Sequence, residues 1–192
     1  MSSQHTEKRT AILEAAVELF ADRGLHGAPT VAIAERAGVG VGTIYRYFKD
    51  KDDLIDQLHQ DLQERARHHI AAGYDAERPI SERFKFLFSR MLDFLLANPR
   101  EFKFMELHYY SSRGLAERTP STEEEEPIRT LLAEARHLQI FKDAPLDVLE
   151  AIAFGPLVAL AKSHSHRGLP LDEESRKLTV QAAWDALKSN PE

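Results

Sequence analysis

The sequence contains no cysteine among its 192 residues. Disulfide bonds, thiolate catalysis and cysteine-bound zinc are therefore excluded, and the composition agrees with a reducing compartment. The sequence also lacks an apolar run of membrane-spanning length, and its N-terminal residues lack the apolar core of a signal peptide. We therefore expect a cytoplasmic protein that makes no contact with a membrane.

The motifs of several enzyme classes are also missing. The sequence has no glycine-rich phosphate loop, no nucleophile elbow and no H-E-x-x-H zinc motif. His68 and His69 are adjacent and point in different directions on a helix, and His164 and His166 are two positions apart. We expect no enzyme activity, no metal site and no cofactor.

Negative charge is in excess, but it is unevenly distributed. The net charge is −6, and residues 1–51 hold seven Lys and Arg against six Asp and Glu, which leaves −7 for the remainder. An acidic body repels nucleic acid, so only the nearly neutral N-terminal part is able to approach DNA. Any affinity for DNA should be moderate and should fall with salt.

The chain is organised around residues 30–51, which read as two short helices joined by a tight turn. Thr30 is a suitable N-cap for the first helix, and Gly38 ends it, because glycine adopts a positive φ without steric cost. In the second helix Ile44 and Phe48 form a buried pair at i and i+4. Two helices and a Gly-bearing turn are typical of a helix-turn-helix, whose second helix lies in the major groove of DNA.

These residues resemble the TetR family of one-component transcriptional repressors. The resemblance is carried by A-E-R-A-G-V-G-V-G-T-I-Y-R-Y-F-K-D-K-D-D-L and by the preceding A-I-L-E-A-A-V-E-L-F-A-D-R-G. It covers the first fifty residues or so closely, and beyond them only the all-helical outline. The resemblance implies a homodimer that binds palindromic double-stranded operator DNA and responds to a small-molecule effector, whose identity the sequence does not give.

We expect the second helix of the pair to supply most DNA contacts. Thr43 and Tyr47 match positions that hold phosphates in the family. Arg46 is able to read guanine or to bind a phosphate, and the sequence does not decide between these roles. The predicted DNA-binding residues are Thr30, Val41, Gly42, Thr43, Tyr45, Arg46, Tyr47 and Lys51.

The other members of this set have alternatives. Val41 is suited to a thymine methyl group, and Gly42 allows close approach of the backbone. Tyr45 either binds a phosphate or packs internally. Lys51 either binds a phosphate at a helix N-terminus or is solvated. Lys8 and Arg9, near the start of a first helix from about Thr6 to Arg23, face the same choice.

A fourth helix should run from about Lys51 to Ala72 and connect two domains. Asp50 caps it, and Asp53 stands where a capping box needs an acid. Its polar second half is typical of a helix that bridges domains. We expect a helix-turn-helix DNA-binding domain over residues 1–51 and a helical regulatory and dimerisation domain over residues 52–192. The fold class is all-α, with about nine helices.

The following segment is rich in large apolar side chains. Helices are predicted over Pro79–Ala97 and Arg100–Arg113, with another around Ile128 to Leu138. The first two helices contain eight Phe and Tyr residues in one stretch of about thirty residues. Such side chains line ligand cavities between helices, although a purely aromatic core is the alternative. The predicted ligand residues are Phe88, Met91, Leu92, Phe104, Met105, His108, Tyr109 and Leu132, with His108 or Tyr109 as the orienting group. The acidic run Glu123–Glu126 reads as a solvated helix start.

The last two helices, about Leu146–His166 and Asp172–Ser189, carry more small and apolar residues than a surface layer needs. Pro156 should kink the first of them. Two such helices from each chain form a four-helix bundle, and a palindromic site requires a two-fold protein. The predicted dimer contacts are Leu157, Leu160, Ala161, Leu178, Ala182 and Trp184; the alternative is that these helices only close the core of one chain.

Three functions remain open. The first is a DNA-binding repressor that a small, largely apolar ligand releases. The second is a DNA-binding regulator of the same fold whose C-terminal domain binds a protein or no effector. The third is a helical enzyme in which the helix-turn-helix pattern is accidental. Binding to a short palindrome separates the first two from the third, and ligand binding separates the first from the second.

Overall fold

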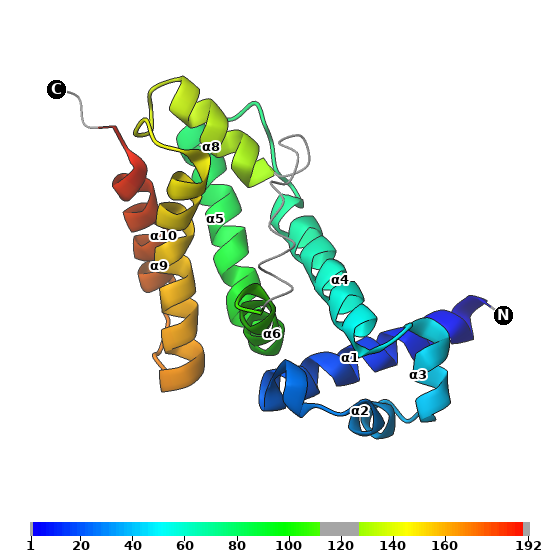
Figure 1. The fold of residues 1–192 in the computed structure, drawn as a ribbon. Helices are drawn as coiled ribbons and strands as arrows, with labels where there is room; N and C mark the ends of the chain where they lie inside the picture. Colours follow the sequence, from blue (N-terminus) through cyan, green and yellow to red (C-terminus); the bar gives the residue numbers. More distant parts are fainter. Residues whose placement is uncertain (1, 112–126, 190–192) are drawn as a thin grey trace. The chain divides into compact units, whose positions relative to one another are not determined.

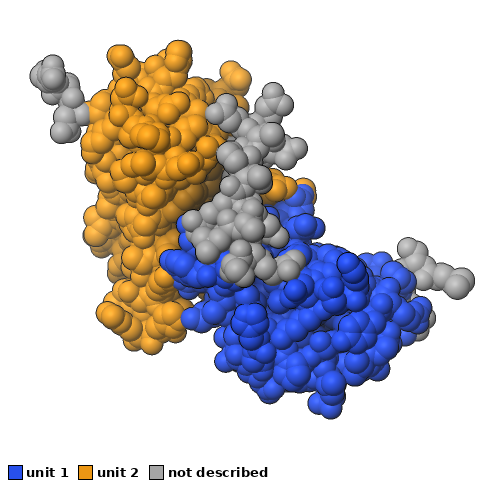
Figure 2. Space-filling view, in the orientation of Figure 1, with its two compact units in different colours: residues 1–65, 100–119 blue, residues 66–99, 120–192 orange. Residues whose placement is uncertain are grey.

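The computed structural model describes residues 2–111 and 127–189, with side chains from residue 5 onward, and the described parts are all-α, as predicted (Figure 1). The chain divides into two compact units, coloured separately in Figure 2. Unit 1 comprises residues 1–65 and 100–119, and unit 2 comprises residues 66–99 and 120–192. The predicted acidic helix start at Glu123–Glu126 lies outside the described residues.

Unit 1 contains α1 (Ser2–Gly27), α2 (Thr30–Arg36), α3 (Val41–Tyr47), the first part of α4 (Lys51–Ala71) and almost all of α6 (Pro99–Tyr109). Gly24, which directly follows the predicted end of the first helix at Arg23, has a non-helical backbone (φ 77°, ψ 164°), and one further helical turn follows it. A single apolar cluster joins all five helices. Its largest fully buried members are Ile12, Phe20, Ile33, Ile44, Phe48, Leu54, Leu58, Leu62 and Phe104.

Helix α6 was not expected in this unit, since the predicted domain boundary after residue 51 assigns it to the regulatory domain. Phe104 is fully buried, and its ring stacks on Phe20 of α1 with centroids 5.8 Å apart. The boundary found by packing lies within α4, between residues 65 and 66, and α6 returns to the N-terminal helices. Packing therefore groups α6 with the N-terminal helices, and the division into a DNA-binding and a regulatory domain stays a prediction.

Unit 2 contains the end of α4 together with α5 (Ile80–Ala97), α8 (Pro127–His137), α9 (Leu146–Arg167) and α10 (Glu173–Leu187). Its core is aromatic. Phe84 stacks on Phe88 at 4.0 Å and meets the edge of Trp184 at 5.3 Å and of Phe141 at 5.8 Å. Buried Arg83 closes this core by donating to Glu134 and to the Tyr74 hydroxyl, each at 2.8 Å.

The last two helices lie close to their predicted bounds, and their ends have identifiable caps. Asp172 caps α10 by accepting a hydrogen bond from the Ser175 amide at 2.8 Å, and α9 ends at Gly168 in the left-handed conformation. Helix α9 continues through Pro156 as one helix. Among the described helices, none combines the length and the apolar character needed to cross a membrane.

Candidate nucleic-acid interface

Helices α2 and α3 form a helix-turn-helix whose turn depends on Gly38 (Figure 1). Gly38 has φ +67°, and its amide donates to Glu35 O, while the Val39 amide donates to Ala34 O at 3.0 Å. These two bonds form a Schellman motif, which satisfies the last carbonyls of α2 and reverses the chain. The predicted role of Gly38 is confirmed.

The inner face of α3 is formed by Ile44, which is buried with 1% exposure, and the next buried residue is Phe48 at the C-cap, also with 1% exposure. The Phe48 amide donates to Ile44 O at 2.9 Å and closes the last turn. Both belong to the apolar cluster of unit 1. The buried pair expected from the sequence is therefore confirmed, and the opposite face of α3 is left to solvent.

The solvent face of α3 carries the predicted DNA-binding residues. Gly42, Tyr45 and Arg46 are exposed, whereas Val41, Thr43 and Tyr47 are half-buried. Tyr45 is 52% exposed, which removes internal packing as its role.

Tyr47 is placed by its neighbours. Its ring lies 4.4 Å from that of His5 on α1 and 6.3 Å from that of Phe48. A half-buried ring between two aromatic neighbours keeps its hydroxyl in a restricted position. Such a hydroxyl is suited to one fixed phosphate contact.

Thr30 was expected as an N-cap, and the structure corrects this prediction. Pro29 occupies the N-cap position (φ −71°, ψ 146°), its carbonyl accepts from the Ile33 amide, and no side chain caps the helix. Proline fixes φ near the value of the extended N-cap, so Thr30 becomes the first helical residue. The Thr30 side chain therefore does not cap α2, in contrast to the prediction.

Lys51 begins α4 and interacts with unit 1 itself. Its ammonium group donates to His26 O at 3.4 Å and lies 5.7 Å from the centroid of the Phe20 ring. Burial lowers the pKa of Lys51, and the neighbouring Asp52 carboxylate acts in the opposite direction. Lys51 is therefore partly buried and bonded, which differs from the solvated lysine considered above.

Two acids fix the start of α4. The Asp50 carboxylate accepts from the Asp53 amide at 2.8 Å, and the Asp53 carboxylate accepts from the Lys49 amide at 2.7 Å. Hydrogen bonding from Gln57 is the main cause that lowers the pKa of Asp53. The expected capping box is present in a shifted form, because Asp53 reaches the residue before the N-cap.

The basic residues near the start of α1 differ in their surroundings. Arg9 donates to Gln57 at 3.2 Å and pairs with Asp61 at 3.6 Å, both on α4, and its guanidinium lies over the Phe48 ring. These contacts hold α1 against α4. Lys8 is exposed. Of the two, Lys8 is the one open to a phosphate.

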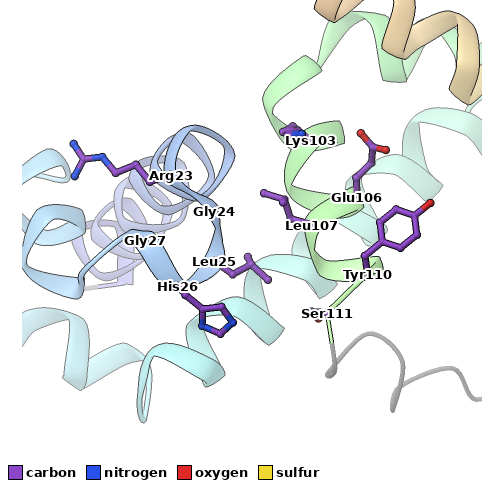
Figure 3. Close-up of a pocket in the computed structure, with 10 residues that line it drawn as sticks. All are labelled: Arg23, Gly24, Leu25, His26, Gly27, Lys103, Glu106, Leu107, Tyr110 and Ser111. Carbon is purple, nitrogen blue, oxygen red and sulfur yellow. The ribbon is translucent and has the colours of Figure 1, made fainter.

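Unit 1 also has a hollow of about 640 Å³ between the end of α1 and α6 (Figure 3). Leu25 and Leu107 approach one another there, whereas the Arg23 side chain points away from α6 (Figure 3). A ligand site requires polar groups that converge on one point. This hollow lacks such convergence and takes no part in the proposal below.

The predicted ligand residues divide between the two units. Phe88, Met91, Leu92 and Leu132 lie in unit 2, where all but Met91 are buried. Phe104 and His108 are buried in unit 1, Met105 packs beside them, and Tyr109 is 53% exposed. The sequence missed the neighbours that enclose Phe88, because Phe154, whose ring stacks on it at 5.5 Å, lies far along the chain.

The predicted dimer residues also separate into two groups. Leu157, Ala161 and Trp184 are buried in unit 2 by the chain's own helices, so they belong to its core. By contrast, Leu160, Leu178 and Ala182 line an apolar hollow of about 410 Å³ on α9 and α10. Leu178 is 68% exposed. The contacts available to a second chain are thus the latter three.

Comparisons with known proteins agree with this geometry. The family model "Bacterial regulatory proteins, tetR family" matches residues 12–58, and "Tetracyclin repressor-like, C-terminal domain" matches residues 79–188. The second match alone covers more than half of the chain.

Individual relatives are transcription regulators. The chain is 37% identical over 75 residues to the fatty acid metabolism regulator protein of Bacillus subtilis (strain 168), covering 33% of this chain and 39% of that protein. It is 33% identical over 79 residues to the transcriptional repressor KstR2 of Rhodococcus jostii (strain RHA1), covering 39% of each. These matches thus span well under two thirds of either relative.

A solved structure extends the similarity to the whole fold. A TetR family transcription regulator from Marinobacter aquaeolei VT8 superposes with a TM-score of 0.89 at 22% identity, covering 99% of this chain and 100% of that one. Together, the two family matches and the helix-turn-helix of α2 and α3 show that the chain belongs to the TetR family of DNA-binding transcriptional regulators.

Proposed function

We propose that the chain is a repressor that binds a palindromic operator as a homodimer and leaves it when a small, largely apolar ligand binds. The observation that carries the DNA-binding part is the outer face of α3. Tyr45 and Arg46 are exposed there, while Ile44 anchors the helix from behind. Arg46 is the residue suited to read a base, and Thr43, Tyr47 and Lys51 are suited to phosphates.

Dimerisation follows from the small size of this reading surface. Helix α3 has seven residues, which offer few base contacts, so useful specificity requires two copies. Two recognition helices fit successive major grooves when they lie about 34–36 Å apart, or a multiple of that distance. We assign the dimer contact to α9 and α10, where Leu160, Leu178 and Ala182 form an exposed apolar surface.

Ligand response is assigned to unit 2. Phe88 and Leu92 on α5 and Leu132 on α8 are each no more than 1% exposed, and Phe88 also stacks on Phe154 of α9. Met91 is half-buried on α5, and a flexible thioether adapts readily to a guest molecule. A ligand there must displace side chains that now contact one another. The group is apolar, which favours an apolar ligand; the name of the Bacillus subtilis relative, a fatty acid metabolism regulator, supports the same class.

The second candidate is a regulator of the same fold without a small-molecule effector. The close packing of unit 2 favours it, since Phe84 and Phe88 already have aromatic neighbours on α9, α10 and the segment between α8 and α9. The two candidates differ in one measurable property. Only the first requires a ligand whose affinity differs between the free and the DNA-bound protein.

The test has two stages. The full-length protein selects DNA from a random pool, and the enriched duplex is titrated by fluorescence anisotropy; a palindromic consensus is the expected result. Fatty acids and small aromatic compounds are then screened for release of that duplex. A ligand that weakens DNA binding must itself bind less tightly in the presence of DNA by the same factor. Selection without enrichment would contradict the DNA-binding role, and a ligand with equal affinity in both states would contradict release.

A further inference from the structure

Glu18 on α1 accepts hydrogen bonds from two arginines that belong to different helices. Arg36 Nε donates to Glu18 Oε2 at 2.7 Å, and Arg100 Nη1 donates to Glu18 Oε1 at 2.9 Å. Arg36 is the last residue of α2, and Arg100 lies in the first turn of α6. Both oxygens of one carboxylate are therefore used to join α2 and α6, although Glu18 and Arg100 are 82 positions apart in the sequence.

Helix α2 is short and needs such an anchor. It has seven residues, and no side chain caps its N-terminal end. Ile33 and Ala34 are its buried residues. The Arg36–Glu18 bond holds the opposite end, two residues before Gly38 at the turn into α3. The position of that end therefore fixes where α3 begins.

Helix α6 shares the same carboxylate. A cation in the first turn of a helix is disfavoured by the helix dipole, and the Glu18 charge offsets this for Arg100. The Phe104–Phe20 stack and the 4.0 Å pair of Glu101 with Arg65 also hold α6 in unit 1. The match to the N-terminal family model ends at residue 58, about forty residues before α6 begins. Helix α6 nevertheless bonds to Glu18 of α1, the same residue that bonds to α2.

We propose that Glu18 is a positioning residue for operator binding, which fixes α2 against α1 and α6 by sharing its carboxylate between Arg36 and Arg100. The Glu18 side chain is 27% exposed, whereas the two arginine side chains are 59% and 56% exposed. Glu18 is thus the least exposed of the three side chains. The proposal rests on operator binding by α3, as proposed above.

Whether removal of the Glu18 charge strengthens or weakens operator binding distinguishes a positioning role from long-range electrostatics. DNA is a polyanion, so removal of one negative charge from the unit that contacts it should strengthen binding when only long-range attraction is affected. Positioning gives the opposite sign, because Glu18→Gln loses the two charged bonds and loosens α2. We expect Glu18→Gln to weaken operator binding about twofold to fivefold, the range of one or two exposed ion pairs.

Glu14→Gln is the matched control. Glu14 is exposed on the same helix, so its substitution removes the same charge without the two arginine bonds. We expect Glu14→Gln to bind the selected operator as tightly as wild type or more tightly. If Glu18→Gln binds as tightly as Glu14→Gln, the positioning role is wrong.

The link to α6 is tested by a double-mutant cycle. Arg100→Gln removes the α6 bond and leaves Arg36, so we expect an effect smaller than that of Glu18→Gln. Once Glu18 is substituted, Arg100→Gln should cause no further loss, because its partner is absent. Additive losses would show that Arg100 acts independently of Glu18 and would overturn the shared link.

A measurement without DNA keeps this inference distinct from the proposed function. Hydrogen exchange of the α2 amides, residues 30–36, should be about twofold to fivefold faster in Glu18→Gln than in wild type or Glu14→Gln. Urea unfolding of the same variants reports any loss of overall stability, which would accelerate exchange throughout unit 1. Unchanged α2 exchange in Glu18→Gln would refute the proposal even where an operator is found. Faster exchange confined to α2, with no operator selected, would support the anchor and count against DNA binding.

Discussion

His59 on α4 and His108 on α6 stack with ring centroids 3.9 Å apart and ring planes inclined by 19°. His108 is buried with 1% exposure, and His59 is half-buried. Burial, and to a lesser extent the charge of His108, lower the pKa of His59 to about 4, while Asp56 acts in the opposite direction. Folded His59 is therefore neutral at neutral pH, where its ring joins α4 to α6.

This contact predicts a loss of stability in mild acid. An unfolded histidine takes up a proton near pH 6.5, whereas folded His59 resists protonation until about pH 4. Between these values only the unfolded state gains the proton, so the free energy of unfolding should decrease as the pH falls from 6.5 to 4. Because the His59 ring is only partly buried, we expect about 1 kcal/mol rather than the full linkage value. Urea unfolding at pH 7.5 and pH 5.0 measures it.

The control for this prediction is an exposed histidine. His59→Gln should reduce the difference between the two pH values, while His166→Gln, at an exposed position near the end of α9, should preserve it. An equal pH dependence in His59→Gln and wild type would show that other groups cause the acid sensitivity.

Alanine substitution at two glycines of the helix-turn-helix should change the stability of the protein in opposite directions. Gly38 has φ +67°, where alanine is strained, so Gly38→Ala should cost about 1 kcal/mol of stability. Gly42 lies inside α3, and beyond its chain neighbours and the backbone of its own helix an added Cβ would meet no atom within 4 Å, so Gly42→Ala should stabilise the protein by roughly 0.5 kcal/mol. Thermal unfolding at fixed protein concentration compares the two variants with wild type.

Gly42→Ala has a second expected consequence. If the backbone at Gly42 approaches DNA closely, the added methyl group should weaken operator binding about tenfold even though it stabilises the fold, a loss of roughly 1.4 kcal/mol. Anisotropy titration with the selected duplex measures this. Operator affinity equal to wild type would remove Gly42 from the interface.

The helix-turn-helix was predictable from sequence because its signals are local. Gly38 and the Ile44–Phe48 pair are fixed by a positive φ and by helical spacing, and both predictions are confirmed. The cap of α2 was misassigned because two residues, Pro29 and Thr30, each suit the start of a helix. Proline prevailed since its ring restricts φ before any side-chain hydrogen bond forms.

Contacts between distant segments were not predictable in the same way. The sequence of α6 is apolar on most of its faces, so its pattern does not show which neighbours bury Phe104. Similarly, the apolar residues of α9 and α10 do not reveal which face the core. Leu157 proved to be buried within one chain, whereas Leu178 is 68% exposed. Periodicity identifies a face but not its partner.

Substitutions at three of the polar residues of the proposed DNA interface should impair binding in different ways. Arg46→Ala should relax preference at one base position per half-site, if Arg46 reads a base. Lys51→Ala should weaken binding on all sequences and reduce the salt slope by about one unit. Tyr47→Phe removes an uncharged donor, so it should weaken binding uniformly with little change in slope. Titrations on the consensus and on single-base variants, each at several salt concentrations, measure all three.

Lys85→Ala is the control for lost charge, since Lys85 is exposed on α5 in unit 2. Wild-type affinity and salt slope are expected for it. Wild-type behaviour of the Arg46, Tyr47 and Lys51 variants together would mean that α3 is not the DNA-reading helix.

The α9 and α10 surface should control the oligomeric state. Leu178→Glu places a charge in the apolar hollow that Leu160 and Ala182 also line, and burial of an unpaired charge against a second chain is strongly unfavourable. Leu178 is 68% exposed in one chain, so the variant should still fold. We expect monomers by sedimentation equilibrium at micromolar concentration and loss of operator binding.

Leu169→Glu is the control, because it adds the same charge at another exposed leucine, 41% exposed and outside the hollow. It should remain dimeric and bind DNA. A wild-type protein that sediments as a monomer, or a dimeric Leu178→Glu variant, would place the two-fold contact elsewhere.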